Sequence, residues 1–165
     1  MATHEKKSVL FICLGNICRS PIAEAVFLDL LKKKGDLANW HVDSGALGDW
    51  HVGKGPYHRT MKTLKKFGIT DYHHKARLVK TEDFNKFDYI FGMDNANLEG
   101  LEELKPGKEY KAKIQLLGEY DPEKELIIVD PYFDDKDEDF EYVFQQCKRC
   151  CESFLEFSTK DVKAS

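Results

Sequence analysis

The sequence of 165 residues lacks several features that would assign it at once to a broad class of protein. No run approaches the roughly eighteen apolar residues of a membrane span, and the opening MATHEKKS has no apolar stretch suited to a signal peptide. Internal repeats and Pro/Gly-rich linkers are missing, as is the nucleotide-binding pattern G-x-x-x-x-G-K-[ST]. We therefore expect a single cytoplasmic domain over residues 1–165 that is not a nucleoside triphosphatase.

Metal and nucleic-acid chemistry receive little support from the composition. The six histidines are scattered without an H-x-x-x-H pair, and the net charge of −4 offers no basic surface. Acidic residues crowd between positions 130 and 141, so one face should be strongly negative. We expect no metal, no cofactor, and no nucleic-acid or membrane partner.

The five cysteines form two groups, Cys13 with Cys18, and a late trio at 147, 150 and 151. In a reducing cytosol they are expected to be thiols rather than disulfides. The late trio includes a C-x-x-C, but no second pair is nearby to complete a zinc site. These three lie at helical spacing on an apolar stripe from 140 to 154, which predicts core packing.

Apolar runs of strand length alternate with segments of helical periodicity. We predict strands near 9–12, 41–43, 87–93 and 113–117, a strand-like run at 126–129, and helices near 22–31, 57–67, 94–104 and 140–154. This alternation indicates an α/β domain with a parallel sheet covered by helices on both faces. Ligands bind such sheets at the carboxyl ends of the strands, so the loop after the first strand is the first candidate site.

That loop reads Cys13-Leu14-Gly15-Asn16-Ile17-Cys18-Arg19-Ser20, and Ser20-Pro21 suggests a helix N-cap followed by a first-turn proline. Amides of a tight loop that opens a helix form a nest for anions, and Gly15 and Asn16 tolerate the positive φ it needs. Arg19 offers a planar fork of donors for two phosphate oxygens. These donors favour the thiolate of Cys13, which is the nucleophilic form.

A structural interpretation competes with the catalytic one, because Cys13 could simply end a buried strand while Arg19 lies at the surface. The catalytic interpretation is favoured because Cys, Gly, Asn, Arg and Ser-Pro fall together at a strand-to-helix junction. Ser20 is then placed to stabilise the thiolate when a covalent intermediate breaks down.

The segment VLFICLGNICRSPIAEAVF resembles the N-terminal signature of the low-molecular-weight protein tyrosine phosphatases. The resemblance continues through VDSGA, FDYIFGMD, KAKIQLLGEYDP, IIVDPYF and QQCKRCCESFLE, and covers nearly the whole chain. It implies a four-stranded parallel sheet flanked by helices. It also implies hydrolysis of protein phosphotyrosine and simple aryl phosphates, as an acid phosphatase, through a cysteinyl-phosphate on Cys13.

Asp130 is the expected general acid, and then the general base. It follows an apolar run and precedes Pro131, which stiffens the turn. By position alone an ordinary Asp-Pro turn is equally compatible, and the resemblance of DPYF to the family's acid loop decides between them.

The resemblance further implies roles for residues around the loop. Asn16 and Ser44 match a polar network that supports the loop, with His74 as a third candidate. Trp50 and Tyr132 match aromatic walls of the cleft, where a flat ring suits an aryl phosphate. The loop itself supplies the remaining substrate contacts, from Leu14, Gly15, Asn16, Ile17, Cys18 and Ser20.

Two further expectations concern regulation. A reversible disulfide between Cys13 and Cys18 would make the enzyme redox-sensitive, although Cys18 could equally be a small buried residue at the helix start. Phe133 follows Tyr132 where the family often has a second tyrosine, so a phosphorylation switch would depend on Tyr132 alone.

Other functions remain to be distinguished. An arsenate reductase would need further redox cysteines, and none occurs between Cys18 and Cys147. A non-catalytic phosphotyrosine-binding module could lose the nucleophile or the acid, and both are present. Tyrosine-phosphorylated proteins are the expected partners, together with weak self-association.

Overall fold

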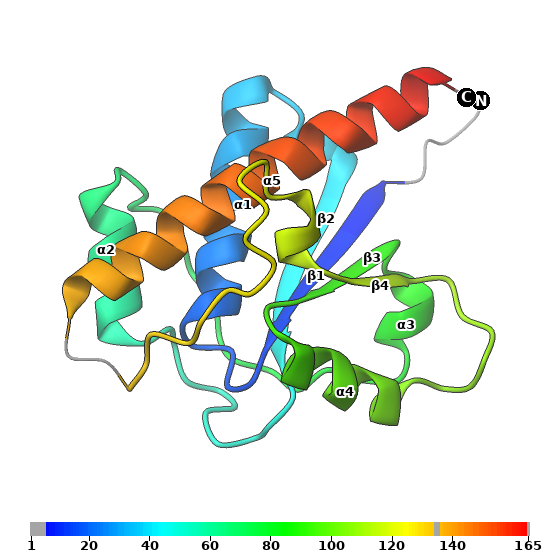
Figure 1. Ribbon diagram of the computed structural model, residues 1–165, viewed down its shortest axis with the longest axis horizontal. Helices are drawn as coiled ribbons and strands as arrows, with labels where there is room; N and C mark the ends of the chain where they lie inside the picture. Colours follow the sequence, from blue (N-terminus) through cyan, green and yellow to red (C-terminus); the bar gives the residue numbers. More distant parts are fainter. Residues whose placement is uncertain (1–5, 134–135, 165) are drawn as a thin grey trace.

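The computed structural model describes residues 6–133 and 136–164, and it places one parallel sheet at the centre of the molecule (Figure 1). The four strands are β1 (Lys7–Cys13), β2 (Trp40–Ala46), β3 (Tyr89–Gly92) and β4 (Lys113–Leu116). Their order across the sheet is β2-β1-β3-β4, and each neighbouring pair is parallel. The predicted four-stranded parallel sheet is therefore confirmed.

Helices cover both faces of this sheet (Figure 1). They are α1 (Arg19–Lys34), α2 (His58–Lys66), the short α3 (Asp83–Lys86), α4 (Asn95–Leu104) and α5 (Asp137–Ala164), with 3-10 turns η1 (Leu37–Asn39) and η2 (Leu117–Tyr120). None of the helices in the described part of the chain is both long and apolar enough to cross a membrane.

Strand β1 divides the core between the two faces, because successive side chains of a strand point in opposite directions. Val9 and Phe11 pack into the larger cluster with α1 and α5, which includes Phe27 and Phe154. Leu10 and Ile12 pack into the smaller cluster, which contains residues of α3 and α4. The central strand is thus buried on both faces, as its continuous apolar run predicts.

Several predicted boundaries hold. Gly35 ends α1 in the left-handed conformation (φ 68°), after Lys32–Lys34. Asp94 caps α4, since its Oδ1 accepts a hydrogen bond from the Asn97 amide at 2.8 Å. The three late cysteines are buried on α5, so the core-packing prediction is confirmed.

Two local predictions are wrong. Helix α1 begins at Arg19, and the Ser20 side chain makes no cap; its hydroxyl lies 3.0 Å from Cys13 Sγ. Residues 126–129 form no strand, because their backbone groups bond to Met93, Arg19 and Gln146 and not to the edge strand β4. The segment crosses beside α5 instead (Figure 1). The short α3 was not foreseen, since a four-residue helix carries too little periodicity to detect.

Candidate active site

The loop between β1 and α1 wraps around the sulfur of Cys13. Asn16 takes a left-handed conformation (φ 58°), which turns the loop amides inward. The Asn16 amide lies 3.3 Å from Cys13 Sγ, the Ser20 amide 3.5 Å, and the Ser20 hydroxyl 3.0 Å. Two backbone amides therefore donate to one sulfur at the start of a helix, and the Ser20 hydroxyl forms a third hydrogen bond with it.

Arg19 is buried beside this loop and connects it to the rest of the site. Its Nη1 donates to Asp94 Oδ2 at 2.6 Å and to the Ile128 carbonyl at 2.9 Å. Its Nη2 lies 3.8 Å from Asp130 Oδ2. Because Asp94 fixes one side of the guanidinium, the arginine is held in place before any ligand arrives.

Asp94 was foreseen only as a helix cap. Its Oδ1 accepts the capping hydrogen bond from the Asn97 amide, and its Oδ2 accepts a second hydrogen bond from Arg19. Sequence reasoning had one usable signal for this second contact. Asp94 follows β3, the neighbour of β1, and the carboxyl ends of adjacent parallel strands meet at one edge of the sheet.

A buried polar network underlies the loop. Asn16 donates through Nδ2 to the hydroxyls of Ser20 (2.8 Å) and Ser44 (3.0 Å), and its Oδ1 lies 2.7 Å from His74 Nε2. The structure thus brings together the three residues that the resemblance had singled out, Asn16, Ser44 and His74. Among buried groups, such a fully bonded network rigidifies what it touches.

The network ends on Glu24 of α1, which was not foreseen. Its Oε1 accepts hydrogen bonds from Ser44 Oγ and from Tyr72 Oη, both at 2.6 Å. Burial raises the pKa of Glu24 to about 7, and burial lowers the pKa of His74. The amphipathic pattern gave no sign of this residue, because a glutamate within a helix usually faces solvent.

Glu24, Asp43 and His74 also place ligand atoms within 4.8 Å of one another, close enough to surround a cation. These groups already have partners, since Ser44 and Tyr72 bond to Glu24, and Arg77 Nε bonds to Asp43 at 2.9 Å. We therefore assign the cluster to support of the loop.

A cavity of about 300 Å³ opens above Cys13, close to the size of a small-ligand site. Tyr132 forms one wall and packs against Tyr57, with ring centroids 5.1 Å apart. Trp50 and Phe133 stand at the mouth and are 64% and 86% exposed. The lining residues are Cys13, Leu14, Gly15, Ile17, Cys18, Arg19, Trp50, His51, Asp130, Tyr132 and Phe133.

Most predicted site residues reach this cavity, and His51 is an addition. The imidazole of His51 lies close to Gly15, where an added Cβ would be 3.1 Å from His51 Cδ2. Asn16, Ser20, Ser44 and His74 do not line the cavity, and hydrogen bonds link their side chains to one another behind it. The expected phosphorylation target, Tyr132, is half-buried.

Asp130 enters the cavity from a different direction than the loop. Its Oδ1 accepts a hydrogen bond from the Tyr132 amide at 3.0 Å, which closes a tight turn at Pro131. The other oxygen, Oδ2, faces Arg19. The site therefore brings a thiol sulfur, a buried guanidinium and a carboxyl group together on the walls of one cavity.

Comparison with known proteins agrees with this geometry. Residues 8–164 match the family model described as low molecular weight phosphotyrosine protein phosphatase. The chain is similar to the rat protein of that name, at 53% identity over 94% of this chain and 98% of the relative.

Solved structures share the fold of this chain. Primo-1 superposes with a TM-score of 0.85 at 45% identity, over 91% of this chain and 97% of the other. A Drosophila arginine phosphatase superposes with a TM-score of 0.83 at 42% identity, over 91% and 96% of the two chains.

Proposed function

The chain belongs to the low molecular weight phosphotyrosine protein phosphatase family, and from that premise we propose that Cys13 is its nucleophile and Asp130 its general acid. Cysteine-based hydrolysis of phosphotyrosine is the chemistry of this family. The observation that carries the residue assignment is the convergence of the Asn16 amide, the Ser20 amide and the Ser20 hydroxyl on Cys13 Sγ.

In the first step the phosphate is held by amides of the loop between Leu14 and Arg19 and by the guanidinium of Arg19. The Cys13 thiolate attacks phosphorus, an S–P bond forms, and the bond to the tyrosine oxygen breaks. Asp130 gives its proton to the departing phenolate. Arg19 and the amides stabilise the negative charge that spreads over the phosphoryl oxygens in the transition state.

In the second step Asp130, now a carboxylate, takes a proton from water. The resulting hydroxide attacks phosphorus, the S–P bond breaks, and inorganic phosphate leaves. The Ser20 hydroxyl, 3.0 Å from Cys13 Sγ, stabilises the thiolate as it departs. Asn16, Ser44 and His74 hold the loop in shape in both steps and take no part in bond making.

The walls of the cavity favour an aryl ester. Ile17, Trp50 and Tyr132 present apolar surface to a substrate ring, and Asp130 is the only acidic residue that lines the cavity in the described part of the chain. A phosphoarginine guanidinium, suggested by the Drosophila arginine phosphatase, would find few acceptors there. Parallel assays on phosphotyrosine and phosphoarginine peptides should therefore show a strong preference for the former.

The same site should hydrolyse simple aryl phosphates as an acid phosphatase. Asp130 must carry a proton when it donates to the leaving group, so turnover should fall as the pH rises. A cytoplasmic location and tyrosine-phosphorylated protein partners belong to this proposal. The exposed rings at the mouth suit weak self-association, which sedimentation at increasing concentration would detect.

Oxidative regulation through Cys18 is a further part of the proposal. Hydrogen peroxide would oxidise the Cys13 thiolate to a sulfenic acid, and the Cys18 sulfur would then displace water to form a disulfide. Burial raises the pKa of Cys18 to about 12, so Cys18 stays a protonated thiol while Cys13 reacts with the oxidant. A Cys18→Ser variant should recover less activity with reductant after peroxide; equal recovery would exclude the role.

Turnover of an aryl phosphate by wild type, Cys13→Ser and Asp130→Ala tests the central assignment. Cys13→Ser should abolish activity, and Asp130→Ala should lower it on the order of 10²–10⁴-fold, the usual contribution of general acid–base catalysis. Glu138→Gln, an exposed carboxylate on α5, is the matched control and should be unchanged. Activity retained in Cys13→Ser would overturn the mechanism.

A further inference from the structure

The segment from Asp121 to Asp130 carries the proposed acid but contains no helix or strand. Much of it is exposed, including the apolar side chains of Leu126 (52%) and Val129 (69%). A general acid must stay within hydrogen-bond reach of the leaving oxygen to be effective. Some contacts must therefore position this segment.

Its central part is held by the site itself. The Ile128 amide donates to the Met93 carbonyl at 2.9 Å, the Ile128 carbonyl accepts from Arg19, and the Ile128 side chain is fully buried. Gly118 lies against the backbone of Leu126, two residues before Ile128, and a Cβ added at Gly118 would be 2.1 Å from the Leu126 carbonyl oxygen. The backbone thus packs closely on one side.

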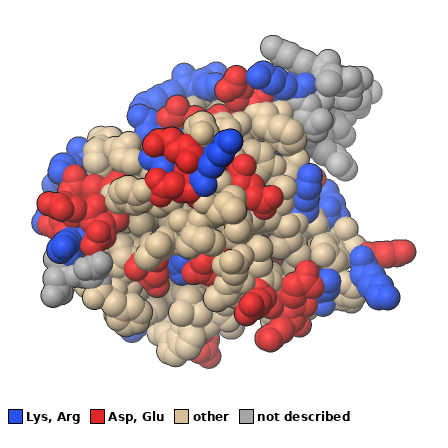
Figure 2. Space-filling model, in the orientation of Figure 1, with Lys and Arg blue, Asp and Glu red and all other residues tan. Residues whose placement is uncertain are grey.

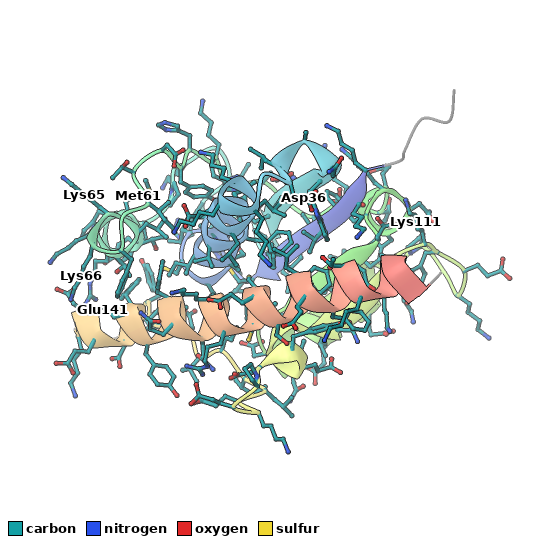
Figure 3. All side chains as sticks on the ribbon, turned by 90° about the horizontal axis from the view of Figure 1, so that it is seen from above. Asp36, Met61, Lys65, Lys66, Lys111 and Glu141 are labelled. Atoms are coloured by element: carbon teal, nitrogen blue, oxygen red, sulfur yellow. The ribbon has the colours of Figure 1, made fainter. Side chains whose placement is uncertain are left out.

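Helix α5 holds the other side. Tyr142, Gln146 and Arg149 follow one another at i, i+4 and i+7 and so share a face of the helix. The Tyr142 hydroxyl bonds to the Glu125 carboxylate, and Arg149 Nη2 lies 3.6 Å from Glu125 Oε1. Figure 2 shows acidic and basic side chains gathered where the segment passes α5, and Figure 3 shows the segment to one side of the helix.

Gln146 differs from its neighbours on this face because it is almost completely buried (1% exposed) and reaches the backbone. Its Nε2 donates to the Ile127 carbonyl at 3.0 Å and to Glu125 Oε2 at 3.3 Å. A buried amide is costly unless it is hydrogen-bonded. Its two bonds end three and five residues before Asp130.

We propose that Gln146 is a positioning residue for the general acid. Its hydrogen bond to the Ile127 carbonyl fixes the backbone that leads to Asp130. This inference rests on the proposed role of Asp130. Arg19 holds the carbonyl of residue 128 and Gln146 holds that of residue 127, so the segment is fixed from the loop and from α5 at consecutive peptide groups.

The test is Gln146→Met, which keeps the length of the side chain and removes the donor, against Gln145→Met at the adjacent exposed glutamine. We measure kcat/KM for aryl phosphates with good and poor leaving groups, and the inhibition constant of inorganic phosphate. Gln146→Met should lose about tenfold on the poorest leaving group, a fraction of the 10²–10⁴ that a general acid supplies. It should lose little on the best, and phosphate binding and Gln145→Met should be unchanged.

A uniform loss across leaving groups, or an equal loss in Gln145→Met, would overturn the proposal. Asp130→Asn, assayed in parallel, separates the role of Asp130 from that of Gln146. If the loss of kcat/KM in Asp130→Asn does not depend on the leaving group, the assignment of Asp130 as the acid fails. If that loss depends on the leaving group but the loss in Gln146→Met does not, only the role of Gln146 fails.

Should Gln146→Met not fold, Glu125→Ala removes the second partner of the amide at a partly exposed site and should shift the same dependence in the same direction. An unchanged dependence in Glu125→Ala would count against the proposal.

Discussion

The loop that carries Cys13 and the segment that carries Asp130 line the same cavity but are built differently. The loop is short, lies between a buried strand and a helix, and rests on buried side chains such as Asn16 and Ser44. The segment is longer, irregular and largely exposed, and residues distant in sequence hold it, namely Arg19, Gln146 and Arg149. The proposed nucleophile therefore has a rigid support, while the proposed acid depends on a few separate contacts.

This difference predicts where mutations act. Changes beneath the loop should alter anion binding and the stability of the fold together, because its supports are part of the core. Changes along the segment should alter proton transfer and leave anion binding intact.

Replacement of the residue that joins the two regions should have the largest effect. Arg19→Lys keeps the charge but loses the planar fork that bonds to Asp94 and the Ile128 carbonyl. We expect kcat/KM to fall on the order of 10²–10³-fold, as for removal of a transition-state donor. Steady-state kinetics with phosphate as inhibitor is the measurement, and unaltered phosphate binding would contradict the assignment of Arg19 to the anion site.

The support beneath the loop should show itself in the pH dependence of stability. The pKa of Glu24 is raised by burial to about 7, so the folded protein binds more protons than the unfolded chain between the ordinary glutamate pKa and that value. Stability should therefore be lost as the pH rises through this window. Relative to Glu24→Gln, which can still accept from Ser44 and Tyr72, wild type should lose about 3 kcal/mol by pH 8.

Denaturant unfolding of both proteins from pH 4 to pH 8 gives the comparison. Below the ordinary glutamate pKa the two curves should run parallel. A difference that is independent of pH across the whole range would mean that Glu24 titrates normally.

Displacement of the segment from outside the cavity should have a smaller effect that is limited to proton transfer. Gly118→Ala places a Cβ against the Leu126 carbonyl, and such overpacking costs about 1–3 kcal/mol. We expect a lower melting temperature and a loss of kcat/KM that grows for poor leaving groups. Gly55→Ala is the control, since a Cβ added there would lie 3.9 Å from its nearest neighbour beyond the adjacent residues, the His74 carbonyl oxygen. An equal effect in Gly55→Ala would show that the loss does not come from displacing the segment.

The smallest effect should come from the aromatic walls. Tyr132→Ala removes a half-buried ring packed on Tyr57, and should raise KM for aryl phosphates roughly 2–10-fold, the contribution of about one aromatic pair. Phe133→Ala removes a ring that is 86% exposed and should change KM less. A larger rise in KM for Phe133→Ala than for Tyr132→Ala would mean that Phe133, at the mouth of the cavity, is the main aromatic contact of the substrate.

Sequence reasoning predicted the two regions unequally, for a physical reason. The strand, the loop and α1 are encoded locally, because the buried run ending at Ile12 and the Lys–Gly stop at Gly35 lie within one short stretch. The course of residues 126–129 depends on Gln146 and Arg19, which are remote in sequence, so an apolar run was mistaken for a strand. Glu24 and Asp94 were missed as site residues for the same reason, since their partners are set by the fold.

The most direct test of the account is to trap turnover by rapid quenching and locate the phosphate by mass spectrometry. The account predicts a phosphorylated Cys13 that accumulates during turnover in Asp130→Ala, where hydrolysis of the intermediate lacks its base, and that is absent from Cys13→Ser. Turnover without any phosphate on Cys13, or phosphate found on another residue, would contradict it.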